Sequence, residues 1–303
     1  MARWSRGRIA IGVGIAVLLI AAVVGLGLVR SGAFRSAAPA PASPSIQTTS
    51  APPPSPTIQT TAPPSVPPPQ PSAEPQPEPS AQPPAPPPAG LPVSLRGLDL
   101  ERIPTSQRVV ALTFDAGANN AGLQSILSTL ATNRVPGTFF LTGSWVNQYP
   151  DGVAAIINGG HRIGNHSMTH PSFTTLTDAQ IAVQISSAEE TIQAAGADPR
   201  PFFRFPSGAR NDRTIADVNT AGYVAIRWTV DTLGWQGTVN GTRGPAFVTQ
   251  RVMAAAQPGE IVLMHLGSNP DDGSTLDAAA LPQIIAQLRA AGYGFVTLDA
   301  VLG

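Results

Sequence analysis

The chain has 303 residues, with 18 basic and 18 acidic side chains, so its formal net charge is zero at pH 7. A balanced charge creates no overall field that would draw the chain to nucleic acid, and we expect no nucleic-acid partner. The absence of cysteine excludes disulfides, thiolate catalysis and cysteine-ligated zinc. Any bound metal must therefore use histidine, carboxylate or amide ligands.

The first predicted element is an uncharged apolar run over residues 9–29, which follows a short basic segment, residues 1–8. As a helix this run would reach about 30 Å, the thickness of the hydrocarbon core of a bilayer. Three arginines precede it and two follow it, a bias that favours a cytoplasmic N-terminus. We predict a single-pass anchor in the cell membrane with the rest of the chain extracytoplasmic. The alternative is a cleaved signal segment and a secreted protein, although signal segments usually have shorter apolar regions, of about 7–15 residues.

Residues 30–94 are predicted to form a disordered linker rich in proline, alanine, serine and threonine. Of the 33 prolines, 22 lie between Pro39 and Pro92, a stretch without aromatic residues that cannot build a core. Extended chain of this kind could hold a domain up to roughly 150 Å from the membrane. That reach suits a substrate in the cell wall, while a plain spacer or a ligand for proline-binding modules is the alternative.

Residues 95–303 have ordinary apolar content and are predicted to form one folded domain. Short apolar runs predict strands at 109–114, 138–141, 202–205, 223–229, 261–265 and 294–297. Longer periodic runs predict helices at 122–133, 178–195, 213–221, 246–256 and 276–291. Because strands and helices alternate, the strands are expected to pair in parallel.

Alternation alone does not distinguish an open, doubly wound sheet from a barrel. Five polar residues stand at or just past the carboxyl ends of predicted strands, where (β/α) barrels gather their active sites. They are Asp115, His166, Arg204, Asp231 and His265. This placement favours a barrel.

Two of the four histidines, His166 and His170, are four residues apart. On one helical turn they would project from the same face and could share a cation, while Pro171 prevents a long helix. A lone pair with this spacing is more often a surface detail, so the pair gains weight only from its neighbours in the sequence.

Asp115 ends an apolar strand and precedes a glycine, a position suited to a base or, equally, to capping the next helix. His265 ends another strand and can exchange a proton near neutral pH, although a buried structural histidine is the alternative. Arg204 stands beside a turn, and Asp231 and Trp235 share the loop that follows the next strand.

The segments TFDAG, HSMTH, RFPSG, DTLGW and LMH occur in this order. Together they resemble the five motifs of the polysaccharide deacetylases, the NodB-homology domains of carbohydrate esterase family four. The resemblance covers about residues 109–298 and implies a distorted (β/α) barrel of about seven strands. It implies a hydrolase that removes N-acetyl groups from a polysaccharide, and the anchor and linker favour peptidoglycan as that substrate.

The resemblance also implies roles for single residues. Asp115 would be the general base, Arg204 would orient it, and His265 would be the general acid. His166 and His170 would hold a divalent metal, most simply zinc, with cobalt or manganese as alternatives. The wall of the groove and its pocket for the acetyl methyl group would come from Phe205, Pro206, Ser207, Trp235 and Leu263, with the Ser207 N–H as an oxyanion donor.

Two aspartates of the family pattern are replaced. Ala116 stands where a second aspartate usually completes the metal site, which leaves three outcomes: a third ligand from Asn119 or Asn120, a water, or Asp115 used as a ligand. Gly234 stands where an aspartate usually tunes the acid histidine, and Asp231 is the candidate to take over that role. An amide oxygen binds zinc less well than a carboxylate does, so we expect weaker or altered metal preference.

The third motif departs as well, because Ser207 replaces the usual tyrosine. These departures leave two other functions open. The chain could be a catalytically impaired homologue that still binds wall glycan, or an amidase for a small non-sugar amide.

Overall fold

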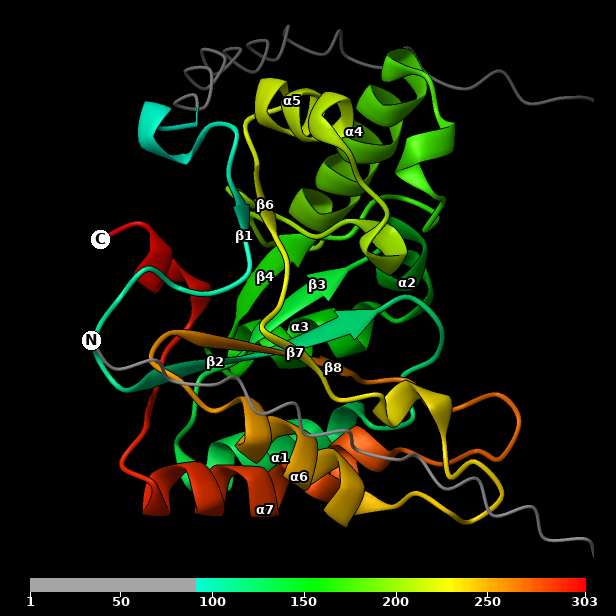
Figure 1. The fold of residues 1–303 in the computed structure, drawn as a ribbon. Helices are drawn as coiled ribbons and strands as arrows, with labels where there is room; N and C mark the ends of the chain where they lie inside the picture. Colours follow the sequence, from blue (N-terminus) through cyan, green and yellow to red (C-terminus); the bar gives the residue numbers. More distant parts are fainter. Residues whose placement is uncertain (1–90) are drawn as a thin grey trace, which may run out of the picture. The chain divides into compact units, whose positions relative to one another are not determined.

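A computed structural model of the chain describes the fold of residues 91–303 (Figure 1). The predicted N-terminal segment 1–8, anchor 9–29 and linker residues 30–90 lie outside this range. Within residues 91–303, no helix is both long and apolar enough to span a bilayer.

One curled sheet of nine strands forms the centre of the domain, and its strands pair in parallel. Its order is β1-β6-β5-β4-β3-β2-β8-β7, with β9 also beside β2. The strands are β1 Asp99–Leu100, β2 Val109–Ala116, β3 Thr138–Leu141, β4 Arg162–Asn165, β5 Phe202–Phe203, β6 Val224–Ile226, β7 Val230–Asp231, β8 Glu260–His265 and β9 Gly294–Phe295. The predicted parallel α/β architecture is confirmed.

The sheet is a half-barrel and not a closed barrel. In the described part of the chain no strand pairing joins the end strands β1 and β7. Irregular segments cross this gap: the Thr229 hydroxyl donates to the Glu101 carbonyl at 2.7 Å, and Arg102 forms an antiparallel bridge with Glu260. The prediction of a barrel of about seven strands is therefore corrected to a curled half-barrel of nine strands. Four of these strands, β1, β5, β7 and β9, are only two residues long, and the short end strands β1 and β7 do not pair to close the barrel.

Helices cover the sheet in two groups. In Figure 1, α1, α6 and α7 pack together on one side of the curled sheet, and α4 and α5 pack together on the other. The helices are α1 Leu123–Asn133, α2 Gly143–Gln148, α3 Pro150–Asn158, α4 Asp178–Ala194, α5 Asp212–Thr220, α6 Pro245–Ala255 and α7 Leu276–Ala290. Capping boxes start α4, through Thr177 and Gln180, and α5, through Asn211 and Thr214.

The strand β2 runs through the middle of the core. It is buried on both faces, as expected for a central parallel strand, and it pairs with both β3 and β8. In this register the Asp115 Cα lies opposite Phe140 on one side and His265 on the other. The core thus sets the place of Asp115 at the carboxyl end of the sheet.

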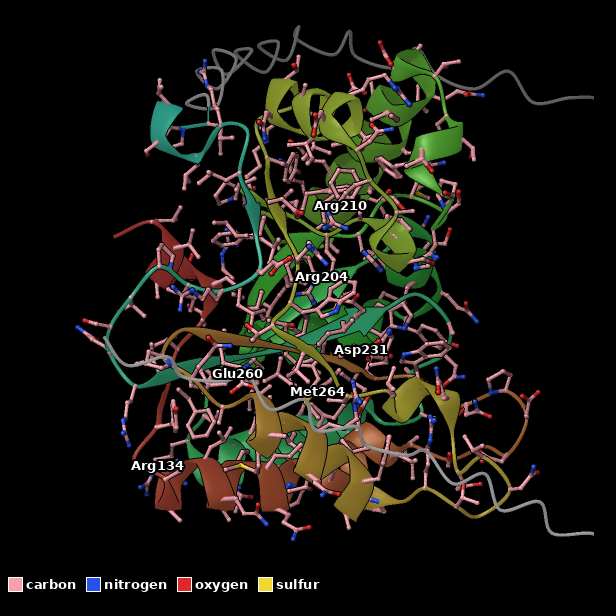
Figure 2. The ribbon with its side chains drawn as sticks, in the orientation of Figure 1. Arg134, Arg204, Arg210, Asp231, Glu260 and Met264 are labelled. Carbon is pink, nitrogen blue, oxygen red and sulfur yellow. The ribbon has the colours of Figure 1, made fainter. Side chains whose placement is uncertain are left out.

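An isolated buried carboxyl group lies at the opposite end of β8. Glu260 is fully buried, and neither of its carboxyl oxygens has a hydrogen-bond partner within residues 91–303. In Figure 2, Glu260 and Met264 mark positions near the two ends of this strand. Burial raises the pKa of Glu260 to about 8. The folded protein therefore holds this proton more tightly than the unfolded chain does.

This raised pKa predicts a loss of stability as the pH rises. The contribution of Glu260 is fully present below its unfolded pKa of 4.5 and is lost as the pH rises through about 8. The slope from one such group is at most about 1.4 kcal/mol per pH unit. Glu260→Gln, which cannot ionise, should flatten the wild-type decline in unfolding free energy measured in urea at pH 5, 7 and 9. Glu190→Gln on the exposed face of α4 is the control, and an unchanged slope in Glu260→Gln would contradict the assignment.

Candidate active site

A cavity of about 630 Å³ opens at the carboxyl ends of β2, β4, β7 and β8. Its volume lies within the range usual for ligand sites. Its lining residues are Asp115, Gly117, Ala118, His166, His170, Phe205, Ser207, Trp228, Asp231, Trp235, Leu263 and His265. Of the predicted site residues, only Arg204 and Pro206 are outside this lining, and both are buried. Five separate segments of the sequence thus converge on one cavity.

Arg204 lies behind the cavity and holds Asp115 in place. Its guanidinium is fully buried, and Nη1 donates to Asp115 Oδ1 at 2.8 Å and to Thr113 Oγ1 at 2.8 Å. Nη2 donates to the carbonyl of Arg227 at 3.0 Å, and Nε donates to the carbonyl of Ile226 at 3.4 Å. These four acceptors fix the direction of the guanidinium.

Asp115 is held as a carboxylate by this contact. Burial alone would raise the pKa of Asp115, but the charge of the Arg204 guanidinium and its hydrogen bond, together with the nearby His166 and His265, hold the pKa below its usual value. Oδ1 accepts from Arg204, and Oδ2 lies 3.5 Å from His166 Nε2. Asp115 is therefore ionised at neutral pH, with one oxygen directed to the imidazole.

The His166 ring is oriented by the backbone of Arg204. Its Nδ1 lies 2.8 Å from the Arg204 carbonyl oxygen, which can only accept, so Nδ1 carries the proton and Nε2 keeps a lone pair. Burial lowers the pKa of His166 to about 4, so the ring is neutral at pH 7. Neutral imidazole with a free nitrogen is the form that binds metals.

The His170 ring lies beside that of His166, with centroids 4.9 Å apart and planes at 75°. The expected helical turn is absent here, because residues 166–170 form an irregular loop after β4. Ser167 and His170 have φ of 70° and 61°, and the His170 N–H donates to Ser167 Oγ at 3.0 Å. The helix interpretation was wrong, and this loop brings the two rings together instead.

The donor set fits a divalent cation with few protein ligands. The His166 lone pair and the negative Asp115 oxygen face each other at 3.5 Å, an arrangement that a cation between or beside them would stabilise. Within residues 91–303, no group of three His, Asp or Glu side chains is arranged to enclose an ion. Catalytic zinc usually has three protein ligands, so this site offers one fewer.

Asn119 does not serve as the third donor in this structure. Its Oδ1 accepts the N–H groups of Ala121 at 3.1 Å and Ser268 at 2.9 Å, and its Nδ2 donates to the Ser268 hydroxyl. The side chain thus ties the loop after β2 to the loop after β8. Asn120 is exposed and does not line the cavity.

The segment from Phe205 to Ser207 forms one wall of the cavity. Ser207 has φ of 53°, a strained conformation for a residue with a side chain. Its N–H has no acceptor among the described residues, so it is free to donate to a ligand. Trp235, which is 46% exposed, and Leu263 supply apolar surface to the cavity. Trp228 also lines the cavity, although the sequence predicted it only as part of a strand.

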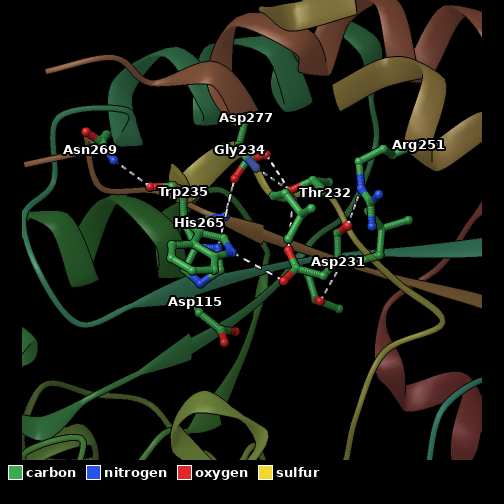
Figure 3. Close-up of polar contacts among 12 residues, drawn as sticks. Asp115, Asp231, Thr232, Gly234, Trp235, Arg251, His265, Asn269 and Asp277 are labelled. Carbon is green, nitrogen blue, oxygen red and sulfur yellow. Dashed lines mark hydrogen bonds and ion pairs between the residues drawn. The ribbon is translucent and has the colours of Figure 1, made fainter. Parts of the chain in front are cut away.

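The polar contacts of Asp231 differ from the expected role (Figure 3). Its carboxylate accepts from the Leu233 N–H at 2.8 Å and from Trp235 Nε1 at 3.2 Å, and so holds the tryptophan at the rim. The carboxylate nearest to the His265 ring belongs instead to Asp277, whose Oδ2 lies 4.0 Å from Nδ1. Sequence reasoning missed Asp277, which stands twelve residues after His265 in the first turn of α7 and outside the five motifs.

Comparisons with known proteins identify the family. A family model described as polysaccharide deacetylase matches residues 102–226. The chain is 32% identical over 196 residues to the peptidoglycan-N-acetylmuramic acid deacetylase PdaA of Bacillus subtilis, covering 64% of this chain and 72% of PdaA. The chain belongs to the polysaccharide deacetylase family. The resemblance drawn from the five motifs is confirmed, and with it the enzyme class, a hydrolase of carbohydrate esterase family four.

Other members of the family are similar over part of their length. The chain is 34% identical to the peptidoglycan-N-acetylglucosamine deacetylase PgdA of Listeria monocytogenes, covering 70% of this chain and 42% of PgdA. A solved structure of a family pseudoenzyme from Bacillus anthracis has a TM-score of 0.62 and 31% identity, covering 69% of this chain and 70% of that protein. A mutant of that pseudoenzyme has restored enzymatic activity.

The contacts of Arg204 predict a large loss of stability in Arg204→Lys. An ammonium group cannot reach Asp115 and the carbonyls of Ile226 and Arg227 together, so buried acceptors lose their donors. We expect the free energy of unfolding to fall by about 2–4 kcal/mol, measured by urea titration. Arg213→Lys, in an exposed ion pair, is the control and should cost less than about 1 kcal/mol. Equal effects of the two substitutions would show that the buried network is not important for stability.

Proposed function

We propose that this cell-wall deacetylase hydrolyses the N-acetyl groups of peptidoglycan and uses a divalent cation, most simply zinc, held by His166 and His170. One observation carries the proposal. The Asp115 carboxylate, the neutral His166 imidazole with its free nitrogen, and His265 face one cavity from the carboxyl ends of β2, β4 and β8. Amide hydrolysis requires a base, a means of activating the carbonyl and an acid for the departing amine.

Each residue has a definite part in this reaction. Asp115 removes a proton from the attacking water as the water oxygen bonds to the carbonyl carbon of the acetyl group. Arg204 keeps the Asp115 carboxylate in place. His265 donates a proton to the nitrogen as the C–N bond breaks, so that acetate and a free amine leave. The cation, when bound, supplies polarisation of the carbonyl and a lower pKa for water. The Ser207 N–H donates to the developing oxyanion, and Trp235 and Leu263 surround the methyl group.

Peptidoglycan is supported as the substrate by two independent features. PdaA and PgdA are both named for peptidoglycan, one for its N-acetylmuramic acid and the other for its N-acetylglucosamine. The apolar run at residues 9–29 and the proline-rich residues that follow would hold the domain outside the membrane, within reach of the wall. We therefore propose a membrane-anchored protein whose catalytic domain is extracytoplasmic.

The proposed base and acid predict the effect of two substitutions on acetate release. The purified full-length chain should release acetate from peptidoglycan, and Asp115→Asn and His265→Ala should each lower kcat by roughly 10²–10⁴-fold. Chelation should abolish the activity, and added zinc, cobalt or manganese should restore it. Ser186→Ala, on the exposed face of α4, is the control and should behave as wild type. Equal activity in all four proteins, or full activity in a metal-free sample, would contradict the mechanism.

Ala116 favours one other function, a domain that binds wall glycan without cleaving it. The side chain is fully buried and provides no donor to a cation, and a pseudoenzyme is among the similar structures. Measuring peptidoglycan binding and acetate release in the same purified full-length chain distinguishes a deacetylase from a domain that only binds glycan. Retained binding of peptidoglycan with no acetate released at any metal concentration would establish the binding domain and exclude the enzyme.

Restoring a carboxylate at this position gives a further prediction. Ala116 is packed among apolar residues, so in metal-free protein Ala116→Asp should lower the melting temperature, because a buried charge is not paired. Added zinc should reverse that loss and raise the melting temperature of the variant more than that of wild type, since metal bound only to the folded state stabilises it. Ala116→Asn, which has the same shape without the charge, is the control. An equal response to zinc in both variants would show that position 116 does not face the cation.

A further inference from the structure

Gly234 leaves space that another element fills. A Cβ atom on Gly234 would lie 2.5 Å from the Asp277 Cγ and 2.8 Å from its Oδ2, and closer still to Oδ1. No side chain can occupy that space while the Asp277 carboxylate is there. Asp277 comes from α7, which follows β8 in the chain, so a carboxylate reaches the loop after β7 from a different part of the fold.

The Asp277 carboxylate is held on both of its oxygens. Oδ1 accepts the Thr232 hydroxyl at 2.6 Å, and Oδ2 accepts the backbone N–H of His265 at 2.8 Å (Figure 3). The residue is only 2% exposed, and burial raises the pKa of Asp277 to about 6. A carboxyl group buried this deeply is costly unless a cation compensates for it.

The His265 ring is the group that can provide this compensation. Its Nδ1 is buried, has no hydrogen-bond partner among residues 91–303, and lies 4.0 Å from Asp277 Oδ2. The ring also lines the cavity. The carboxylate is thus on the buried side of the imidazole, where a proton on Nδ1 would be attracted to it.

We propose that Asp277 is the positioning residue of His265. It favours the ring form with the proton on Nδ1, directs the other nitrogen to the cavity, and stabilises the imidazolium before it gives its proton to the amine. This inference rests on the proposed function for the step that it assists. The geometric claim, a carboxylate from α7 paired with His265 in the space left by Gly234, stands apart from that step.

A purely structural role for Asp277 has different consequences. Asp277 lies in the first turn of α7 and accepts two hydrogen bonds, so its role could be only to hold α7 against the loop after β7. Loss of that role would lower stability but would not change how His265 takes up protons. The other titratable side chains that line the cavity with His265 are Asp115, His166, His170 and Asp231, and each remains in the variants below.

The first experiment moves the carboxylate from one position to the other. Asp277→Ala should lower kcat for acetate release by roughly 10–100-fold with little change in KM. Gly234→Asp alone should lower the melting temperature, because the two side chains compete for one space. The double variant Gly234→Asp/Asp277→Ala should recover the melting temperature and most of kcat. A double variant no more stable or active than the worse single variant would overturn the inference.

The second experiment does not depend on activity. The titration of the His265 ring is followed by NMR in the full-length chain, with the signals assigned through His265→Gln. In Asp277→Asn, which keeps the shape and an acceptor for Thr232, the midpoint should fall, because an opposite charge 4.0 Å away is lost. An unchanged midpoint would overturn the inference. If the wild-type chain releases no acetate but the midpoint still falls in Asp277→Asn, the pairing is supported and only the proposed function is refuted.

Discussion

The buried contact between Arg204 and Asp115 is the constraint on which the site depends. The guanidinium of Arg204 holds the carboxylate, while the carbonyl of the same residue accepts from His166 Nδ1 and so directs Nε2 toward Asp115. One residue therefore orients both the proposed base and a proposed metal ligand. Without this cation, burial would favour the neutral form of Asp115, which could not act as a base at neutral pH.

The fold places these groups together because the carboxyl ends of parallel strands meet at one edge of the sheet. The loops that leave this edge are strained: Ser167, His170, Ser207 and Leu233 all have positive φ. Such conformations persist only where the surrounding packing requires them, and they are common at functional sites. Rigid strands thus carry Asp115 and His265, while strained loops carry the proposed ligands and the oxyanion donor.

Sequence patterns predicted the long elements and most of the residues that line the cavity, but not the contacts between them. The five predicted helices form with ends shifted by one residue at most, whereas the helices α2 and α3 were not predicted. The strands β1 and β7 are two residues long and depend on their neighbours. Asp277 was beyond prediction, because its proximity to Gly234 exists only in three dimensions.

The two aspartates of the family pattern that this chain lacks, at Ala116 and Gly234, have different outcomes. The Asp277 carboxylate occupies the space that Gly234 leaves, whereas within residues 91–303 no third acidic or imidazole ligand compensates for Ala116. The central claim is therefore that two imidazoles beside Asp115 still bind a cation. A crystal structure of the protein grown with zinc tests it most directly. The account predicts an ion about 2.0–2.1 Å from one nitrogen each of His166 and His170. Rings turned apart, or no ion between them at saturating zinc, would contradict it.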